Sequence, residues 1–272
     1  MKGIVKWFIL LVFSWFPVSY SYAQAPTHSA DTSRMGVRQI HQAPPPKIKP
    51  IRHEVSLGLR LNTDGWSVYS DIGRIKPLDV RRADMFYKVR VLQIELSEKK
   101  DPSEAKITSV IGSSSNGSGK YIYGKINNFY ALKLGIGFRK MIAGKPDPGA
   151  VSIHWLNLVG VALGMLKPYY IDVYNSGAIK YTPSTESNFL NQQLIEGSGG
   201  FSKGIDEMKF IPGAHFKSAL HFDFSTNKKN AIAAEAGVNA EYYSQPIAIM
   251  ANQTGKPYFV DLYIALQFGR RW

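Results

Sequence analysis

The chain of 272 residues contains no cysteine, so disulfide bonds contribute nothing to its stability even if it is exported. Beyond its first residues it also lacks any run of about 18 apolar residues, the length that a transmembrane helix needs. The sequence therefore excludes a membrane-spanning helix in the exported part of the chain. The remaining classes are a soluble β protein and a barrel that crosses a membrane with strands.

The first 23 residues have the three parts of a secretory signal peptide. Lys2 and Lys6 supply the positive charge, residues 7–18 form the apolar part, and Ala23 ends the small-residue pattern Ser-Tyr-Ala. The apolar part is too short to serve as a membrane anchor. We expect residues 1–23 to be a signal peptide that is cleaved after Ala23.

The chain carries a formal net charge of +13, which becomes +11 when Lys2 and Lys6 are removed (13 − 2). A charge of this size is common in nucleic-acid-binding proteins. For an exported chain, however, we expect anionic lipid headgroups of an outer membrane to be the counterpart. Outer-membrane lipid and other envelope proteins are therefore the predicted partners, and nucleic acid is not.

Residues 24–51 form a basic segment that contains three consecutive prolines, Pro44 to Pro46. Proline at this density prevents both helices and sheet ladders. We expect an extended periplasmic tail, and a plain spacer is favoured over a docking peptide.

From residue 52 the sequence changes to segments in which apolar and polar residues alternate, as they do in a strand with one apolar face. These segments cover about residues 54–62, 66–73, 84–97, 130–139, 151–165, 215–224, 232–242 and 258–272. Asp64-Gly65 between the first two is a hairpin signal. The pattern predicts an all-β fold, an antiparallel up-and-down transmembrane β-barrel of about eight strands over residues 52–272.

A soluble sandwich is the alternative, because alternation alone does not say which face meets lipid. The lengths of the connections favour the barrel, since bacterial barrels have short periplasmic turns and longer outer loops. The expected inner turns are 74–83, 141–150 and 225–230, and the expected outer loops are 62–65, 98–128, 172–213 and 244–256. Three of the four outer loops are longer than every inner turn. With this assignment of turns and loops, both termini are periplasmic.

The polar faces of the segments mix glycines with charges, which suits the narrow lumen of an eight-stranded barrel. On the last segment, Asp261, Gln267 and Gly269 are expected to meet charges of the first segment such as Arg60. Large aromatic residues near the strand ends are typical of interfacial girdles. They are Trp66, Tyr130, Trp155, Phe222, Tyr242, Tyr258 and Phe268.

The signal peptide, the glycine-rich alternating segments and the terminal run YFVDLYIALQFGRRW together resemble a known class. They look like the small eight-stranded outer-membrane β-barrel proteins of Bacteroidota-type bacteria, of the OmpX/PorT kind. The resemblance covers residues 52–272 and implies a barrel in the cell outer membrane of a Gram-negative envelope. It carries no catalytic or ligand motif, and the long second and third outer loops depart from the simplest members.

Lipid-modifying barrels such as lipid A deacylases resemble this architecture and need a serine, or a histidine with an acidic partner, near the outer rim. The candidates here are His154, His215 and His221, with Ser152, Asp223 or Glu235. His221 and Asp223 share one strand face, but the expected topology puts them near the periplasmic end. An internal polar network is favoured there, and no metal-ligand spacing is present.

Three loop segments carry weaker signals. The glycine-rich stretches 112–119 and 197–200 lack the P-loop pattern and are expected to be flexible loops. Residues 187–196 have the apolar spacing of a short amphipathic helix. This helix would plug the barrel or dock a partner, or it would pack within its own loop, which is the favoured interpretation.

The sequence therefore predicts a non-enzymatic outer-membrane barrel, a structural or accessory subunit of an envelope complex that recognises partners through its long outer loops. The alternatives are a lipid-modifying enzyme with His154 as base and a narrow, porin-like pore. A pore is disfavoured because side chains fill a lumen of eight strands. No catalytic, cofactor-binding or metal-binding residue is predicted.

Overall fold

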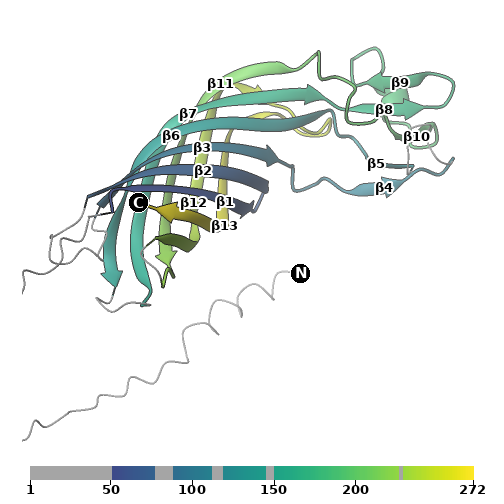
Figure 1. Ribbon diagram of the computed structural model, residues 1–272. Coiled ribbons are helices and arrows are strands. Elements are labelled where there is room, and N and C mark those ends of the chain that lie inside the picture. The colour runs from purple at the N-terminus through teal and green to yellow at the C-terminus, as the bar shows by residue number, and fades with distance from the viewer. Residues whose placement is uncertain (1–50, 77–87, 112–118, 145–149, 227–228) are drawn as a thin grey trace, which may run out of the picture. The chain divides into compact units, whose positions relative to one another are not determined.

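The structure is a computed structural model that describes residues 51–76, 88–111, 119–144, 150–226 and 229–272 (Figure 1). The predicted signal peptide (1–23) and all but the last residue of the predicted tail (24–51) lie outside these residues. No helix in the described ranges is long and apolar enough to cross a bilayer.

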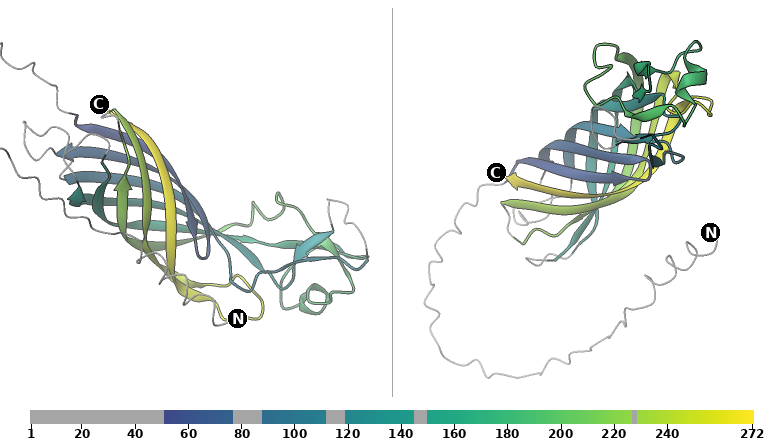
Figure 2. Two further views of the ribbon diagram at one scale, coloured as in Figure 1. Left: turned by 90° about the horizontal axis from the view of Figure 1, so that it is seen from below. Right: turned by 90° about the vertical axis from the view of Figure 1, so that its right-hand side faces the viewer.

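Eight antiparallel strands close into a barrel, in the order β1-β13-β12-β11-β7-β6-β3-β2 (Figures 1 and 2). The strands are β1 (His53–Asn62), β2 (Gly65–Lys76), β3 (Lys88–Lys99), β6 (Asn127–Gly144), β7 (Ser152–Pro168), β11 (Lys209–Asp223), β12 (Asn230–Ile247) and β13 (Lys256–Arg271). Closure is made by β1 and β13, which pair from Glu54↔Arg271 to Asn62↔Tyr263. The predicted eight-stranded antiparallel barrel is confirmed.

Alternation along each strand sorts side chains between the lumen and the outer wall. In β1 every second residue from Glu54 to Arg60 is buried, while Leu57, Leu59 and Leu61 between them are exposed. A side-chain period of two requires this, because neighbouring side chains point to opposite faces of a sheet. The polar parity faces inward, as predicted.

The first hairpin connects β1 and β2 through only two residues, Thr63 and Asp64. Gly65 follows with φ of 154°, and a Cβ there would lie 2.0 Å from the carbonyl oxygen of Glu98. Only glycine permits this close approach of β2 to β3. The Asp-Gly hairpin signal in the sequence is thus confirmed.

Several strands are longer than predicted, and this changes the loop lengths. The outer connections are residues 63–64, 100–126, 169–208 and 248–255. The last is shorter than expected because β12 continues to Ile247, and it does not exceed the residues 77–87 between β2 and β3. The predicted sorting of loop lengths therefore holds for two of the four outer loops and is wrong for the last one.

The two long outer connections form small sheets of their own, which the sequence did not predict. Their elements are β4 (Lys106–Thr108), β5 (Lys120–Ile122), β8 (Tyr170–Val173), β9 (Gly177–Lys180), α2 (Glu186–Phe189) and β10 (Ile195–Ser198). We call the described parts of residues 100–126 and 169–208 the loop head. It extends from one end of the barrel, while the chain end lies at the other (Figures 1 and 2). There the amide of Arg52 donates to the carbonyl of Trp272 at 2.9 Å.

Candidate functional site: outer wall, lumen and loop head

The outer wall of the barrel is covered by exposed apolar side chains. On the closing strand β13, Val260, Leu262 and Ile264 are each at least 60% exposed, and Leu59 and Leu61 continue the surface on β1. Such a continuous apolar surface is unstable in water, because soluble monomers rarely expose patches above a few hundred Å². The wall has the character of a surface that contacts lipid.

Aromatic residues lie toward both ends of this wall. Tyr242 and Tyr258 are directly opposite each other near the end that carries the loop head. At the other end, Trp155 faces outward near the start of β7 and Phe268 near the end of β13. The predicted girdle residues thus bracket the apolar surface from two sides, as Trp and Tyr do at membrane interfaces.

The lumen, in contrast, is filled with buried charge. Acidic and basic side chains are nearly balanced, so the interior needs no counter-ion. The basic ones are Arg60, Lys99, Lys133, Arg139, Lys217 and Arg271, and the acidic ones are Glu54, Asp71, Glu95, Asp223, Glu235, Glu241 and Asp261. Because an unpaired buried charge costs several kcal/mol, each of these groups needs partners. The partners form a connected ladder along the barrel.

The inner half of the ladder begins at the end where the chain terminates. The Nε of Arg271 lies 2.7 Å from Oε2 of Glu54, and Glu54 also pairs with Arg139. Arg139 Nη1 is 2.7 Å from Nε2 of His221, whose Nδ1 lies 3.3 Å from Oε2 of Glu235. These contacts join five strands around the inner part of the lumen.

Arg60 carries the ladder to the middle of the lumen. Its guanidinium lies 3.6 Å from Glu235 and forms a second ion pair with Glu95. The rings of Tyr69 and Tyr263 flank it at 4.4 and 4.3 Å, a double cation–π contact. Arg60 is therefore held on all sides by strands β2, β3, β12 and β13.

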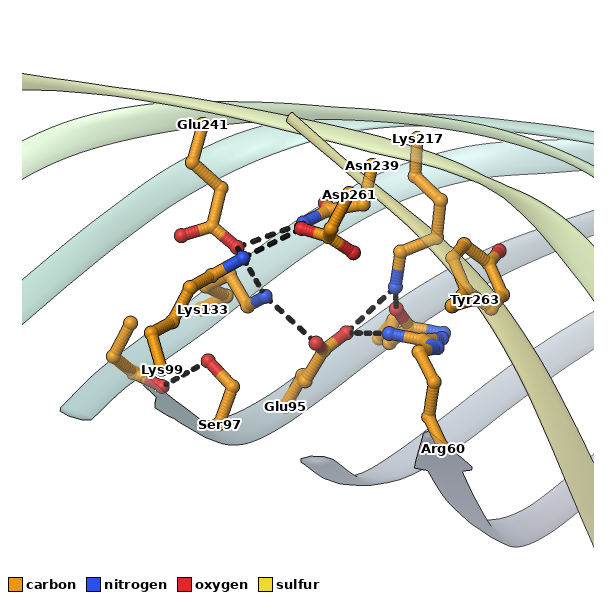
Figure 3. A network of polar contacts seen from close by, with 12 residues as sticks. Arg60, Glu95, Ser97, Lys99, Lys133, Lys217, Asn239, Glu241, Asp261 and Tyr263 are labelled. Carbon is orange, nitrogen blue, oxygen red and sulfur yellow. Dashed lines mark hydrogen bonds and ion pairs between the residues drawn. The ribbon is translucent and has the colours of Figure 1, made fainter. Parts of the chain in front are cut away.

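Glu95 is the point where the ladder branches (Figure 3). Its two oxygens pair with Nζ of Lys133 at 2.7 Å and Nζ of Lys217 at 2.6 Å, besides Arg60. Lys133 then contacts Glu241 at 2.7 Å. One carboxylate thus neutralises three cations that come from β1, β6 and β11.

Lys99 ends the ladder on the side of the loop head. Its Nζ lies 2.5 Å from Asp261, 2.9 Å from Asp64 and 3.3 Å from Glu241. Asp64 belongs to the first hairpin, so a series of ion pairs and hydrogen bonds runs from one end of the lumen to the other. A lumen that is filled in this way is a packed core, and its side chains hold the strands of the barrel together.

Apolar residues close the lumen beyond Lys99. Phe129 and Tyr243 pack edge to face with ring centroids 5.1 Å apart, and both are fully buried. Ile249 and Met250, from the connection between β12 and β13, belong to the same buried cluster. The mouth of the barrel is thus filled by this short fourth loop.

The predicted contacts of Asp261, Gln267 and Gly269 with charges of β1 do not form, and Gly269 lies opposite the uncharged Ser56. Gln267 does meet β1, where its amide donates to the hydroxyl of Ser56, a polar group without charge. Asp261 instead pairs with Lys99. Arg60 is opposite Ala265 of β13 in register, and its guanidinium lies over the ring of Tyr263. The predicted meeting of Asp261 with Arg60 is therefore wrong.

The candidate histidines lie inside the barrel, and two of them sit at its inner end. His154 and His221 are directly opposite in register, with ring centroids 6.0 Å apart. His221 contacts Glu235, whereas Asp223 pairs with Arg271, so the considered contact of His221 with Asp223 does not form. The favoured prediction of an internal polar network is the one that the structure bears out.

The other two candidates do not complete a catalytic group. Ser152 is the first residue of β7 and is directly opposite Asp223. His215 fills the space that Gly135 and Gly160 leave open, since a Cβ at either glycine would come within 2.9 Å of its ring. Among the described residues, no group of three or more histidine and acidic side chains is placed to hold a metal ion.

The loop head has a hydrophobic core that is separate from the lumen. Its buried members come from both long loops, and Phe189 of α2 is only 1% exposed. The others are Tyr121, Ile171, Val173 and Ile195. The predicted helix at 187–196 is thus reduced to α2, and it packs within its own loop, the favoured alternative.

Polar contacts hold the two loops of the head to each other and to the mouth. The hydroxyl of Ser109 donates to the carbonyl of Ile195 at 2.6 Å, which joins the second loop to the third. Lys180 and the hydroxyl of Tyr170 both donate to Glu207, and these bonds lower the pKa of Glu207. The first bond joins the two loops, and the other two join parts of the third loop to each other.

The glycine-rich stretches have different outcomes. Residues 112–118 lie outside the described residues. The stretch 197–200 is not a free loop, because Gly197 and Ser198 belong to β10, and Gly197 is paired with Asp172. The predicted flexible loop is wrong there, since this segment pairs with β8, and a Cβ at Gly199 would lie 2.9 Å from the Cβ of Tyr170.

Comparisons with known proteins add little to this description. No family model matches the chain, and no curated protein matches its sequence. Several solved structures are similar to it, including the following three. The N-terminal β-barrel domain of Pseudomonas aeruginosa OprF is 10% identical, with a TM-score of 0.35, and the match covers 81% of this chain and 96% of that chain. Neisserial surface protein A is 8% identical, with a TM-score of 0.36, and the match covers 81% of this chain and 94% of that chain. Ail, the attachment invasion locus protein of Yersinia pestis, is 8% identical, with a TM-score of 0.33, and the match covers 82% of this chain and 96% of that chain. At these scores, the architecture of this chain rests on its own strand pairing.

Proposed function

We propose that this protein is a non-enzymatic outer-membrane β-barrel with periplasmic termini and an external loop head that recognises other envelope components. The observation that carries the proposal is the distribution of side chains on a closed barrel, with apolar residues outward and a charge ladder inside. Only lipid is a good solvent for such a wall, and closure leaves no strand edge to satisfy.

The two ends of the barrel support the orientation. Bacterial barrels keep their short turns and termini on the periplasmic side and their long loops outside. Here residues 52 and 272 are hydrogen-bonded neighbours, and the 27 and 40 residues of 100–126 and 169–208 leave from the opposite end. The loop head is therefore external in this proposal.

The lumen supports a structural role over the alternatives. A pore needs a continuous water path, and here ion pairs and hydrogen bonds from Glu54 to Asp64 and the apolar cluster around Phe129 occupy the interior. An enzyme of outer-leaflet lipid would need its base near the outer rim. His154 lies at the other end, beside His221.

The loop head supports the recognition role. It keeps its own core around Phe189, so its shape does not depend on a partner. Phe201 and Tyr174 nevertheless remain 71% and 56% exposed on it. Exposed aromatic residues on a rigid support are typical anchors of protein interfaces. We infer an accessory or structural subunit of an envelope complex.

The membrane part is tested by placing a charge on the wall. Ile264→Arg is expected to destabilise the inserted barrel by about 2–4 kcal/mol, since Ile264 lies midway along the apolar face of β13. The measurement is urea unfolding of the protein refolded in phosphatidylcholine vesicles. Val110→Arg in the loop head, where the side chain is 81% exposed, is the matched control and should change little. Equal stability of both variants would contradict a lipid-facing wall.

The recognition role is tested by replacing residues 169–208 with a short turn between β7 and β11, which are paired at that point from Leu166↔Lys209 onward. The barrel should still show heat-modifiable migration. Crosslinking on intact cells should join the wild type to defined envelope proteins and should fail with the shortened variant. Retention of the same crosslinks by the shortened variant would rule out the loop head as the recognition surface.

A further inference from the structure

Five basic side chains gather on one side of the outer wall, at the end opposite the loop head. We call them the basic strip. They are Arg74 and Lys76 of β2, Lys88 and Arg90 of β3, and Lys140 of β6, and all of them are exposed. They are not spread around the barrel, because these three strands are neighbours in the sheet order.

The strand register brings like charges directly together. Arg74 is opposite Arg90, Lys76 is opposite Lys88, and Lys88 is opposite Lys140. Like charges in directly opposite positions destabilise a sheet. Among the described residues, no acidic side chain faces outward at this end of the three strands to offset them. The arrangement favours binding of an external anion.

Aromatic neighbours fix the level of the basic strip relative to the bilayer. Lys140 is directly opposite Trp155, and Arg90 is directly opposite Phe138. The ammonium of Lys88 also lies 5.1 Å from the centre of the Phe138 ring. Since Trp155 of the girdle at this end marks the interface, the basic strip lies at the depth of the lipid headgroups.

A groove on the outer wall connects this charge to the apolar surface. It has a volume of about 680 Å³, and Arg74, Lys88 and Arg90 line its charged end. Its apolar lining includes Ile72, Leu92, Ile136, Val159 and Phe216. The size is that of a small-molecule site, with a few polar groups at one end of an apolar channel. Only an amphiphile with an anionic head matches both parts.

We propose that this groove binds one anionic glycerophospholipid of the inner leaflet, with its phosphate at Arg74, Lys88 and Arg90. One acyl chain lies along Ile72, Leu92 and Ile136. Basic pockets on the cytoplasmic or matrix side of membrane proteins bind anionic headgroups in the same way. The proposal rests on the proposed function, because the inner leaflet meets this end only if the termini are periplasmic.

The test uses the full-length mature protein, refolded in vesicles of phosphatidylcholine with and without phosphatidylglycerol. The variant Arg74→Gln/Lys88→Gln/Arg90→Gln removes the charged end of the groove. Phosphatidylglycerol retained by the protein is measured by native mass spectrometry after transfer to detergent. The wild type should retain phosphatidylglycerol in preference to phosphatidylcholine. The variant should bind phosphatidylglycerol on the order of a hundredfold more weakly, where a tenfold loss of affinity corresponds to roughly 1.4 kcal/mol.

A matched variant loses the same charge elsewhere. Lys106→Gln/Lys120→Gln/Lys209→Gln removes three exposed lysines at the side of the loop head and should keep the wild-type retention. The urea midpoints give a second readout, in which the matched variant controls for a general effect of charge. In phosphatidylcholine alone, the groove variant should be at least as stable as the wild type, because repulsion is relieved. Phosphatidylglycerol should raise the midpoints of the wild type and of the matched variant, and it should leave the midpoint of the groove variant unchanged.

Three results would overturn the proposal. They are equal retention of both lipids by the wild type, equal loss in the matched variant, and a phosphatidylglycerol effect on the midpoint of the groove variant. The failure of the proposed function has a different signature, since a protein that does not insert shows no heat-modifiable band in any vesicle. If the triple variant refolds poorly, Arg90→Gln alone should reduce retention in the same direction.

Discussion

Glu95→Gln is expected to destabilise the barrel by about 3–5 kcal/mol, the cost of breaking a buried ion pair on one side. Glu95 is 2% exposed and neutralises Arg60, Lys133 and Lys217 at once. The amide keeps the shape of the side chain but removes its charge, so three cations in the middle of the lumen share the remaining carboxylates. The measurement is the urea midpoint in phosphatidylcholine vesicles, followed by tryptophan fluorescence.

Glu196→Gln is the matched control, because Glu196 lies in β10 of the loop head, outside the lumen. A second variant separates charge balance from lost packing. Adding Lys217→Met to Glu95→Gln removes one of the surplus cations, and the double variant should be more stable than Glu95→Gln alone. If Glu95→Gln costs less than about 1 kcal/mol, as exposed pairs do, the ladder is not a stabilising network.

The parity of the lumen could be predicted from the sequence, but the pairs within it could not. Alternation fixes which side chains of a strand point inward, and so it correctly places Glu54, Arg60 and Asp261 inside. Which inward groups meet depends on the stagger of the strands around the barrel. Arg60 was expected to meet Asp261 and instead reaches Glu95 and Glu235, on β3 and β12.

The loop head was beyond sequence prediction for a different reason. Its strands β4 and β5 have three residues each, and β8, β9 and β10 have four, which is too short for a period of two to be visible. Such short strands form because the core around Phe189 and Ile171 holds them together. The basic strip is not evident from the sequence, because the segment 84–97 carries apolar and charged residues on the same face as Lys88 and Arg90.

The second large effect is expected at the centre of the loop head, where Phe189→Ala should destabilise the head by about 3–5 kcal/mol. Phe189 is 1% exposed, and its ring packs edge to face on Tyr181 at 5.6 Å. Truncation leaves a cavity in the core that the two loops share. Hydrogen exchange of the amides of β8 and β10 should then increase, while the barrel amides stay protected.

Phe201→Ala is the control with the same chemical change, because Phe201 is 71% exposed and belongs to the surface of the head. It should leave exchange in β8 and β10 unchanged. The comparison also decides how the head is coupled to the barrel. If Phe189→Ala loosens β12 and β13 as well, head and barrel unfold as one unit, and the head is not the independently shaped element that the recognition role requires. If exchange rises in the head alone, the core of the head sets the geometry of its exposed aromatic residues. Loss of the crosslinks to envelope proteins in Phe201→Ala would then assign recognition to the surface around Phe201.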